Sequence, residues 1–296
     1  MSDAVAVLRA ARPGVLALAP LCAGLGVALA WQQGEPPAWV DTLLVLVGAV
    51  LAHAAVNLLN EYEDFVSGLD LITRRTPFSG GSGALPERPS AANGVLLAAL
   101  GTLAMVVAIG LYFLWLRGLP MLVLGAAGVV LVLTYTRWIT RWPLICLLAP
   151  GLGFGPVMIM GTLVAVDARL DSTASIVSLI SLLLVSELLL INQIPDADAD
   201  RKVGRRHLAI TLGKPAAARL VGVLLLASYG LLAAGLLAGW LPAWTAIALA
   251  PVPAALWINL RLPAALTDPL QLRTVLGVNV VTLLATLALL ISGLSL

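Results

Sequence analysis

The sequence contains nine apolar runs, each about as long as a membrane-spanning helix. A helix needs about 20 mostly apolar residues to cross the hydrocarbon core of a bilayer. The runs cover approximately residues 13–32, 38–60, 93–116, 119–135, 142–166, 174–194, 215–239, 241–260 and 274–295. None of them alternates apolar and polar residues, as a transmembrane strand would. The pattern predicts an all-α, multi-pass membrane protein, with nine transmembrane helices in a bundle that forms one domain over residues 1–296.

The composition excludes an ordinary soluble enzyme. Hydrophobic residues make up 60% of the 296 residues and charged residues only 11%, whereas about a quarter of the residues in a soluble domain are charged. The net charge of +2 gives no reason to expect a nucleic-acid partner. Cys22 and Cys146 both lie in apolar runs, which excludes a disulfide framework or a cysteine-based zinc site. The run 13–32 is too long for a signal peptide, so we interpret it as the first spanning helix.

The basic residues are distributed unevenly between the two predicted faces of the bundle. We assign the N-terminus and the loops after every second helix to one side. Only Arg117 and Arg169 of the 17 basic residues then fall on the other side. Cytoplasmic loops carry the excess of Lys and Arg. We therefore expect an integral protein of a prokaryotic cytoplasmic membrane, with its N-terminus inside and its C-terminus outside.

Two connections on the predicted cytoplasmic side, at about residues 61–92 and 195–214, are long and rich in acidic residues. Each follows a predicted spanning helix. At the end of run 38–60, Asn57, Asn60 and Asp64 fall on one helical face, together with His53. A polar stripe of this kind is costly in a membrane unless it faces a bundle interior or a wet cavity. Gly68 is a suitable helix terminator, and Asp70 would then fold back towards the same cavity.

The end of run 174–194 carries a similar pattern. Asn192, Asp196 and Asp200 are spaced four residues apart and share one helical face. Asp198 lies about 200° around the helix from Asp196 and should point elsewhere. Pro195 introduces a kink that would blur this geometry.

The two clusters share the pattern Asn-x-x-x-Asp at equivalent helix ends, which favours one common cavity over two unrelated solvated loops. Carboxylates gathered in one cavity repel one another, and a divalent cation would relieve that repulsion. Oxygen ligands without His or Cys at ligand spacing favour Mg²⁺ over zinc. Cations beside both clusters suit an anionic ligand, and they are Arg74, Arg75, Arg201, Lys202, Arg205 and Arg206. Next to apolar helices, this chemistry points to a lipid-tailed diphosphate.

At these residues the chain resembles the UbiA-type membrane prenyltransferases, a family with nine membrane helices and Asp-rich motifs after helices 2 and 6. The resemblance covers nearly the whole chain. It is closest to the menaquinone branch, which prenylates 1,4-dihydroxy-2-naphthoate. The residues that match its two motifs are Asn57, Asn60, Tyr62, Asp64, Gly68 and Asp70, and Asn192, Asp196, Asp200, Gly204 and Arg205. The departures are Glu61, Gln193, Pro195 and the segment 75–83.

The resemblance implies Mg²⁺-dependent transfer of a polyprenyl group from a polyprenyl diphosphate to an aromatic acceptor. It implies that Asp64, Asp70, Asp196 and Asp200 hold the metal. Asn60 and Asn192 would orient these ligands or bind phosphate, and they complete the expected catalytic set of Asp64, Asp196 and Asp200. The expected diphosphate contacts are Lys202 and Arg205, with Arg74 or Arg75. Tyr62 and Tyr135 would lie near the acceptor.

Several alternatives stay open at this point. The same mechanism would prenylate 4-hydroxybenzoate or a related quinone precursor. A secondary transporter is a different class, but its sites usually lie near the bilayer midplane, on interrupted helices. A lipid-binding scaffold gives no reason for two Asp clusters. Glu187 is either functional or a hydrogen-bonded structural residue, and we favour the second. His53 contacts either substrate or a neighbouring backbone, and nothing in the sequence argues for an oligomer.

Overall fold

The computed structural model describes residues 2–34, 36–73, 75–76 and 78–296. All regular elements in these ranges are helices, so the all-α prediction is confirmed for this part of the chain. The elements are, in chain order, α1 (Asp3–Ala10), η1 (Pro13–Val15), α2 (Leu18–Gln32), α3 (Trp39–Val66), α4 (Leu69–Ile72), α5 (Ala84–Glu87), η2 (Pro89–Ala91), α6 (Ala92–Arg117), α7 (Leu119–Thr134), η3 (Ile139–Arg141), α8 (Pro143–Leu152), the π-helical η4 (Gly153–Met160), α9 (Gly161–Ala165), α10 (Ser172–Lys202), α11 (Leu208–Thr211), α12 (Lys214–Leu237), η5 (Ala243–Leu249), α13 (Val252–Ala265) and α14 (Pro269–Ser295).

Each of the nine predicted runs coincides with helical structure, but nine spans are not confirmed. Among the described residues, seven helical segments are long and apolar enough to cross a membrane. The segment Asp3–Val15 and α2, which meet at 49°, make an eighth if they count as one bent span. The helix α7 has only 16 residues, which is short of the length that a bilayer core requires.

Both helices that carry the acidic clusters are longer than the apolar runs predict. The helix α3 continues to Val66, and α10 continues through Pro195 to Lys202. The expected loops 61–92 and 195–214 are therefore helical at their beginnings, and the Asn and Asp side chains keep the i, i+4 spacing of one helical face. Gly68, with φ of +77°, follows the end of α3, as the sequence predicts. Gly204, with φ of +83°, takes the same role after α10.

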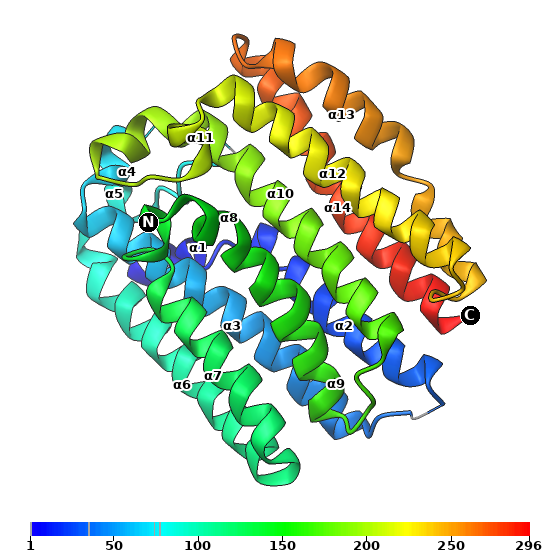
Figure 1. Ribbon diagram of the computed structural model, residues 1–296. Coiled ribbons are helices and arrows are strands. Elements are labelled where there is room, and N and C mark those ends of the chain that lie inside the picture. The colour runs from blue at the N-terminus through cyan, green and yellow to red at the C-terminus, as the bar shows by residue number, and fades with distance from the viewer. Residues whose placement is uncertain (1, 35, 74, 77) are drawn as a thin grey trace.

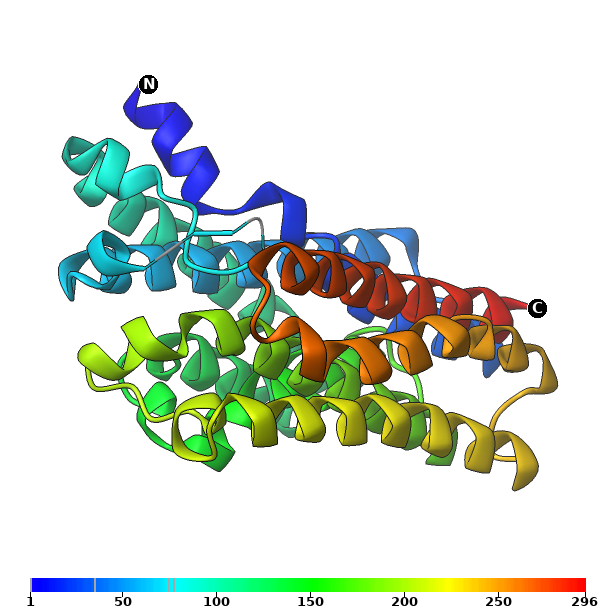
Figure 2. The ribbon, with the colours of Figure 1, turned by 90° about the horizontal axis from the view of Figure 1, so that it is seen from above.

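The elements that carry the polar residues gather at one end of the bundle. The short helices α4, α5 and α11 lie at the same end as the N-terminus, and the C-terminus lies at the opposite end (Figures 1 and 2). The helix α10 is the central one, since 72% of its most apolar stretch is buried, against 17% in α6. It packs against α2, α8, η4, α12 and α14. The polar residues at the end of α10 thus belong to the most deeply buried of the candidate spans.

Glycines allow α8 and η4 to approach α10 at backbone distance. A Cβ added to Gly155 would lie 2.5 Å from the carbonyl oxygen of Ser178, and one added to Gly151 would lie 2.5 Å from that of Leu182. Small residues at such crossings are the usual way for membrane helices to approach closely. Gly153, between them, faces away, and its added Cβ would lie 3.8 Å from Leu131 Cδ1.

We predict that Gly155→Ala destabilises the protein, because backbone atoms of α10 cannot yield to the new methyl group. Overpacking of this kind costs about 1–3 kcal/mol. The measurement is the melting temperature in detergent, with Gly153→Ala as the matched control that should melt like the wild type. Equal melting temperatures for the two variants would contradict the packing described here.

Candidate active site

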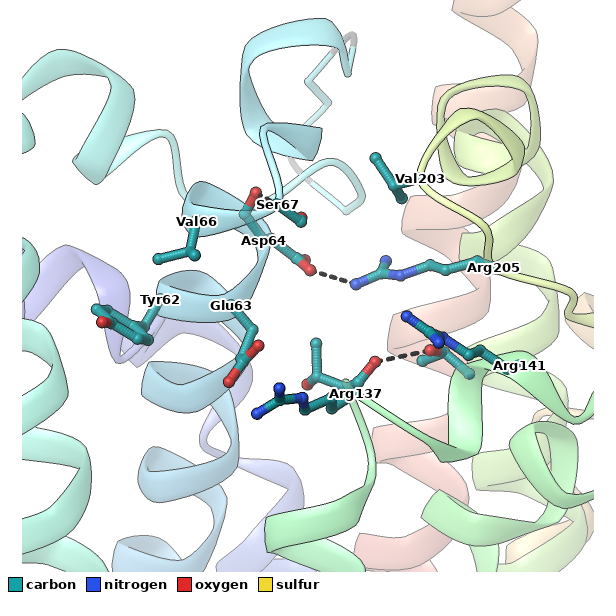
Figure 3. Close-up of a pocket in the computed structure, with 11 residues that line it drawn as sticks. Tyr62, Glu63, Asp64, Val66, Ser67, Arg137, Arg141, Val203 and Arg205 are labelled. Atoms are coloured by element: carbon teal, nitrogen blue, oxygen red, sulfur yellow. Dashed lines mark hydrogen bonds and ion pairs between the residues drawn. The ribbon is translucent and has the colours of Figure 1, made fainter.

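Arg205 joins the two acidic clusters. Its Nη1 lies 2.9 Å from Asp200 Oδ1 on α10, and its Nη2 donates to Asp64 Oδ1 on α3. Figure 3 shows the Asp64 and Arg205 side chains pointing towards one another across a cavity. The second oxygen of Asp200 accepts a hydrogen bond from His207 Nε2 at 2.8 Å. The ends of α3 and α10, far apart in the sequence, are therefore joined by one guanidinium group.

Two other predicted ligands keep an oxygen without a partner. Asp196 Oδ2 accepts the Gly80 N–H at 2.9 Å. Within the described residues, Asp196 Oδ1, Asp70 Oδ2 and Asn192 Oδ1 are buried and have no hydrogen-bond partner. Burial, together with the nearby Glu61 and Asp64 carboxylates, raises the pKa of Asp70 to about 7. The two acidic clusters therefore contain oxygen atoms that accept no hydrogen bond from the described protein groups, and carboxylates that lie close to one another.

Residues 78–83, which we call the closing segment, contact the acidic residues. Glu61 is 1% exposed and accepts hydrogen bonds from the Ser82 N–H, at 3.0 Å, and from the Ser82 hydroxyl. Arg12 Nη2 lies 3.5 Å from Glu61 Oε2. Gly81, with φ of +76°, approaches Asp70 so closely that a Cβ would lie 2.8 Å from Asp70 Oδ1. A glycine is therefore required at position 81, where the backbone passes close to the Asp70 carboxylate.

The donor set fits a magnesium ion, although the side chains are not gathered into a ready-made metal site. At this site, the buried oxygens without partners, on Asp70, Asn192 and Asp196, are carboxylate or amide oxygens, which are ligands suited to Mg²⁺. In the described part of the chain, no three His, Cys, Asp or Glu side chains are grouped closely enough to hold a metal. Arg205 instead lies between Asp64 and Asp200. Metal binding by Asp64, Asp70, Asp196 and Asp200 therefore stays a prediction.

Residues at this end of the bundle line two cavities. The larger, of about 460 Å³, is mostly apolar and runs between α3, α6, α7, η4 and α10. Its polar lining includes Arg12, Asn57, Asn60, Tyr135 and Asn192. The smaller, of about 370 Å³, is lined by three arginines, Arg137, Arg141 and Arg205, and by Tyr62, Glu63 and Asp64 (Figure 3). Thr136, which lines the smaller cavity, donates a hydrogen bond to Asn60, which lines the larger one.

Comparison with known proteins identifies the family of this chain. Residues 17–275 match the UbiA prenyltransferase family. The chain belongs to this family of enzymes. It is 29% identical over 309 residues to the 1,4-dihydroxy-2-naphthoate octaprenyltransferase of Escherichia coli (strain K12), covering 99% of this chain and 97% of that protein. The protein of the same name from Mycobacterium tuberculosis (strain ATCC 25618 / H37Rv) is 29% identical and covers 83% of this chain and 82% of its own.

Solved structures share the fold. The apo structure of a UbiA homolog from Aeropyrum pernix K1 is 19% identical, with a TM-score of 0.69, over 93% of this chain and 97% of that one. A UbiA homolog from Archaeoglobus fulgidus, bound to GPP and Mg²⁺, is 16% identical, with a TM-score of 0.60, over 97% of this chain and 99% of that one. Family membership and the apolar helices together make this an integral membrane prenyltransferase.

Some residues predicted for the prenyltransferase site lie elsewhere. Arg75 Nη1 is 3.7 Å from Glu87 Oε1 on α5, and Arg75 lines neither cavity. Lys202 is exposed and lines neither cavity. Tyr62 lines the smaller cavity, whereas Tyr135 lines the larger. Asp198 points away from the site, as its helical angle predicts, and pairs with Lys214 at 2.7 Å. The prediction for Arg74 lies outside the described residues.

The two residues left open by the sequence have different surroundings. Glu187 is fully buried in the bundle, and its Oε2 accepts a hydrogen bond from Asn279 Nδ2 on α14 at 3.1 Å. This contact supports the structural interpretation. His53 lines the larger cavity, and its ring meets that of Phe154 edge to face at 4.8 Å.

Sequence reasoning missed Arg12 and His207. Arg12 lies outside both motifs and has a left-handed backbone, with φ of +53°, which no residue pattern in the sequence indicates. His207 follows the second motif after the turn at Gly204. That glycine is a usable signal, because a positive φ just after a helix sends the chain back towards the helix end.

We predict that Arg205→Gln lowers the free energy of unfolding by about 3 kcal/mol, because it leaves two largely buried carboxylates without their cation. The measurement is chemical or thermal unfolding in detergent without substrate. Arg206→Gln is the matched control, since Arg206 is exposed and its backbone N–H bonds Thr140 O regardless of its side chain. A double-mutant cycle with Asp64→Asn should give a coupling energy, and additive effects would contradict the bridge.

Proposed function

We propose that this prenyltransferase transfers a polyprenyl group from a polyprenyl diphosphate to an aromatic acceptor, with Mg²⁺, and that the acceptor is 1,4-dihydroxy-2-naphthoate. The observation that carries the proposal is the position of the two acidic clusters, which Arg205 joins, next to the asparagines that line the polar end of the larger, mostly apolar cavity. Asn60 and Asn192 line that cavity. Asp64 lies one helical turn after Asn60, and Asp196 one turn after Asn192, which is about 6 Å along each helix axis. A diphosphate would lie at this end, with its tail in the apolar part.

The chain's own residues would act mainly on the leaving group. Mg²⁺, when bound, neutralises negative charge that develops on diphosphate as the allylic C–O bond breaks. Asp64, Asp70, Asp196 and Asp200 would hold it, and Asn60 and Asn192 would orient these carboxylates or donate to phosphate oxygens. Arg205 would bind diphosphate oxygens, and Arg12, which lines the cavity beside Glu61, is a second cation placed for this.

The cavity would protect the reacting carbon from water. Breaking the allylic bond produces a carbocation, which a water molecule would capture in competition with the acceptor. The closing segment supports this role. Its residue Phe78 lines the cavity, and the N–H groups of Gly80 and Ser82 donate hydrogen bonds to Asp196 and Glu61. Tyr135, which lines the cavity, would offer a ring face to the cation or to the acceptor.

The names of the relatives support the choice of acceptor. Two of the proteins to which the chain is similar are called 1,4-dihydroxy-2-naphthoate octaprenyltransferases, and the first aligns over nearly the whole of both chains. We further propose nine membrane crossings, with the N-terminus and the site on the cytoplasmic side and the C-terminus outside. The opposite placement of the two termini in Figure 1 supports an odd number of crossings.

We predict that Asp64→Asn, Asp196→Asn and Asp200→Asn each lower the rate of prenyl transfer by about a hundredfold or more, because each removes a carboxylate that would hold the Mg²⁺ needed to stabilise the leaving group. Asp198→Asn is the control, since it lies on the same helix but points away from the site. It should stay within about twofold of the wild type. Full activity of Asp64→Asn and Asp196→Asn would contradict the proposed roles.

The acceptor is tested by mass spectrometry of products from purified protein with 1,4-dihydroxy-2-naphthoate and 4-hydroxybenzoate in competition. We expect a decarboxylated prenyl-naphthol that forms with Mg²⁺ and not with EDTA. A prenylated benzoate would keep the reaction class and overturn the acceptor. No prenylated product with either acceptor would contradict the proposed function.

A further inference from the structure

The chain that leaves α10 folds back around Asp200. The backbone carbonyl of Asp200 accepts the Arg205 N–H at 3.1 Å, and its two carboxylate oxygens accept Arg205 Nη1 at 2.9 Å and His207 Nε2 at 2.8 Å. The left-handed turn at Gly204 brings these donors back to the end of the helix. Asp200 thus has a donor on each carboxylate oxygen, whereas Asp196 keeps a buried oxygen without a partner in the described part of the chain.

The His207 ring has no other task that the described structure shows. His207 is the N-cap residue of α11, but its side chain makes no capping bond, and its backbone carbonyl accepts the N–H groups of Ile210 and Thr211. The residue is 1% exposed, and Nδ1 has no partner among the described residues. Because a carboxylate only accepts, Nε2 must carry the proton of the bond to Asp200. His207 lines neither cavity, so it would touch Asp200 and not a bound substrate.

The other donor to Asp200 is shared. Arg205 also pairs with Asp64, and it lines the smaller cavity. Under the proposed function its guanidinium binds diphosphate oxygens as well. His207 is buried and directs its one bonded nitrogen at Asp200 alone, so it is the donor that remains on this carboxylate when Arg205 turns to the substrate.

We infer that His207 is a positioning residue, which holds the Asp200 carboxylate in the orientation that binds Mg²⁺. The inference rests on the proposed function, because it takes Asp200 as one of the metal ligands. A carboxylate that rotates freely must be ordered when the ion binds, and this ordering weakens binding. Groups that hydrogen-bond a metal ligand from behind fix its orientation, and their removal typically costs about ten- to a hundredfold in metal affinity.

The test compares His207→Leu, which removes the donor, with His207→Gln, whose side-chain amide can place an N–H near the position of Nε2. Each purified protein is titrated with Mg²⁺ in detergent, with geranyl diphosphate and without an acceptor, so that the readout does not depend on prenyl transfer. We measure the Mg²⁺ concentration that gives half of the maximal thermal protection, which we call the Mg²⁺ midpoint, and the melting temperature in EDTA. His207→Leu is also made in the Asp200→Asn background, where the carboxylate to be positioned is absent.

We expect His207→Leu to raise the Mg²⁺ midpoint by about tenfold or more, and His207→Gln to stay within about threefold of the wild type. In the Asp200→Asn background, His207→Leu should cause no further shift. A lower melting temperature in EDTA with an unchanged Mg²⁺ midpoint would show a structural role only and overturn the inference. Equal shifts in the two backgrounds would also overturn it.

A second variant covers the case in which His207→Leu does not fold. His207→Asn keeps a polar side chain, but its amide ends near the position of Nδ1 and does not reach Asp200, so the same rise in the Mg²⁺ midpoint is expected. A protected wild type with unshifted variants would overturn the role of His207 and leave the proposed function intact. A wild type that Mg²⁺ and geranyl diphosphate do not protect would overturn the proposed function together with this inference.

Discussion

The charge balance between α3 and α10 is the constraint on which the rest of the structure depends. Carboxylates at the ends of two mainly apolar helices carry a large desolvation cost unless a cation compensates them. Arg205 supplies that cation to Asp64 and Asp200 at once, and His207 bonds the remaining oxygen of Asp200. These contacts fix the relative position of two helix ends that are distant in the sequence. The acidic clusters thereby become one site.

The hydrogen bonds and ion pairs at this site do not satisfy every carboxylate oxygen. Arg12 and Ser82 satisfy Glu61, and Gly80 satisfies one oxygen of Asp196. Among the described residues, the other oxygen of Asp196 and one oxygen of Asp70 have no partner. A protein designed only for stability would pair or remove such groups, because an unsatisfied buried oxygen costs about 1–3 kcal/mol. These oxygens are the groups that would bind the cation under the proposed function.

Helical periodicity predicted the parts of this site that lie on α3 and α10. It placed Asn192, Asp196 and Asp200 together and turned Asp198 outward, and the contact between Asp198 and Lys214 confirms that angle. Periodicity says nothing about segments that leave a helix. Arg12, whose own backbone is left-handed, reaches Glu61, and Arg75 pairs with Glu87, so neither position follows from spacing. The number of spans was equally hard to predict, because α7 has an apolar composition but only 16 residues.

The same helices carry the polar end and the apolar walls of the larger cavity. The helix α3 carries Asn60 and Asp64 near one end and Gly48 towards the other. The helix α7 carries Gly125 about three turns before Tyr135, which belongs to the polar lining of the cavity. Because these levels are separated by roughly 15 Å of helix, a side chain added at Gly48 or Gly125 would not reach the acidic residues. Under the proposed function, cleavage of the diphosphate and accommodation of the tail would then depend on different residues of the same helices.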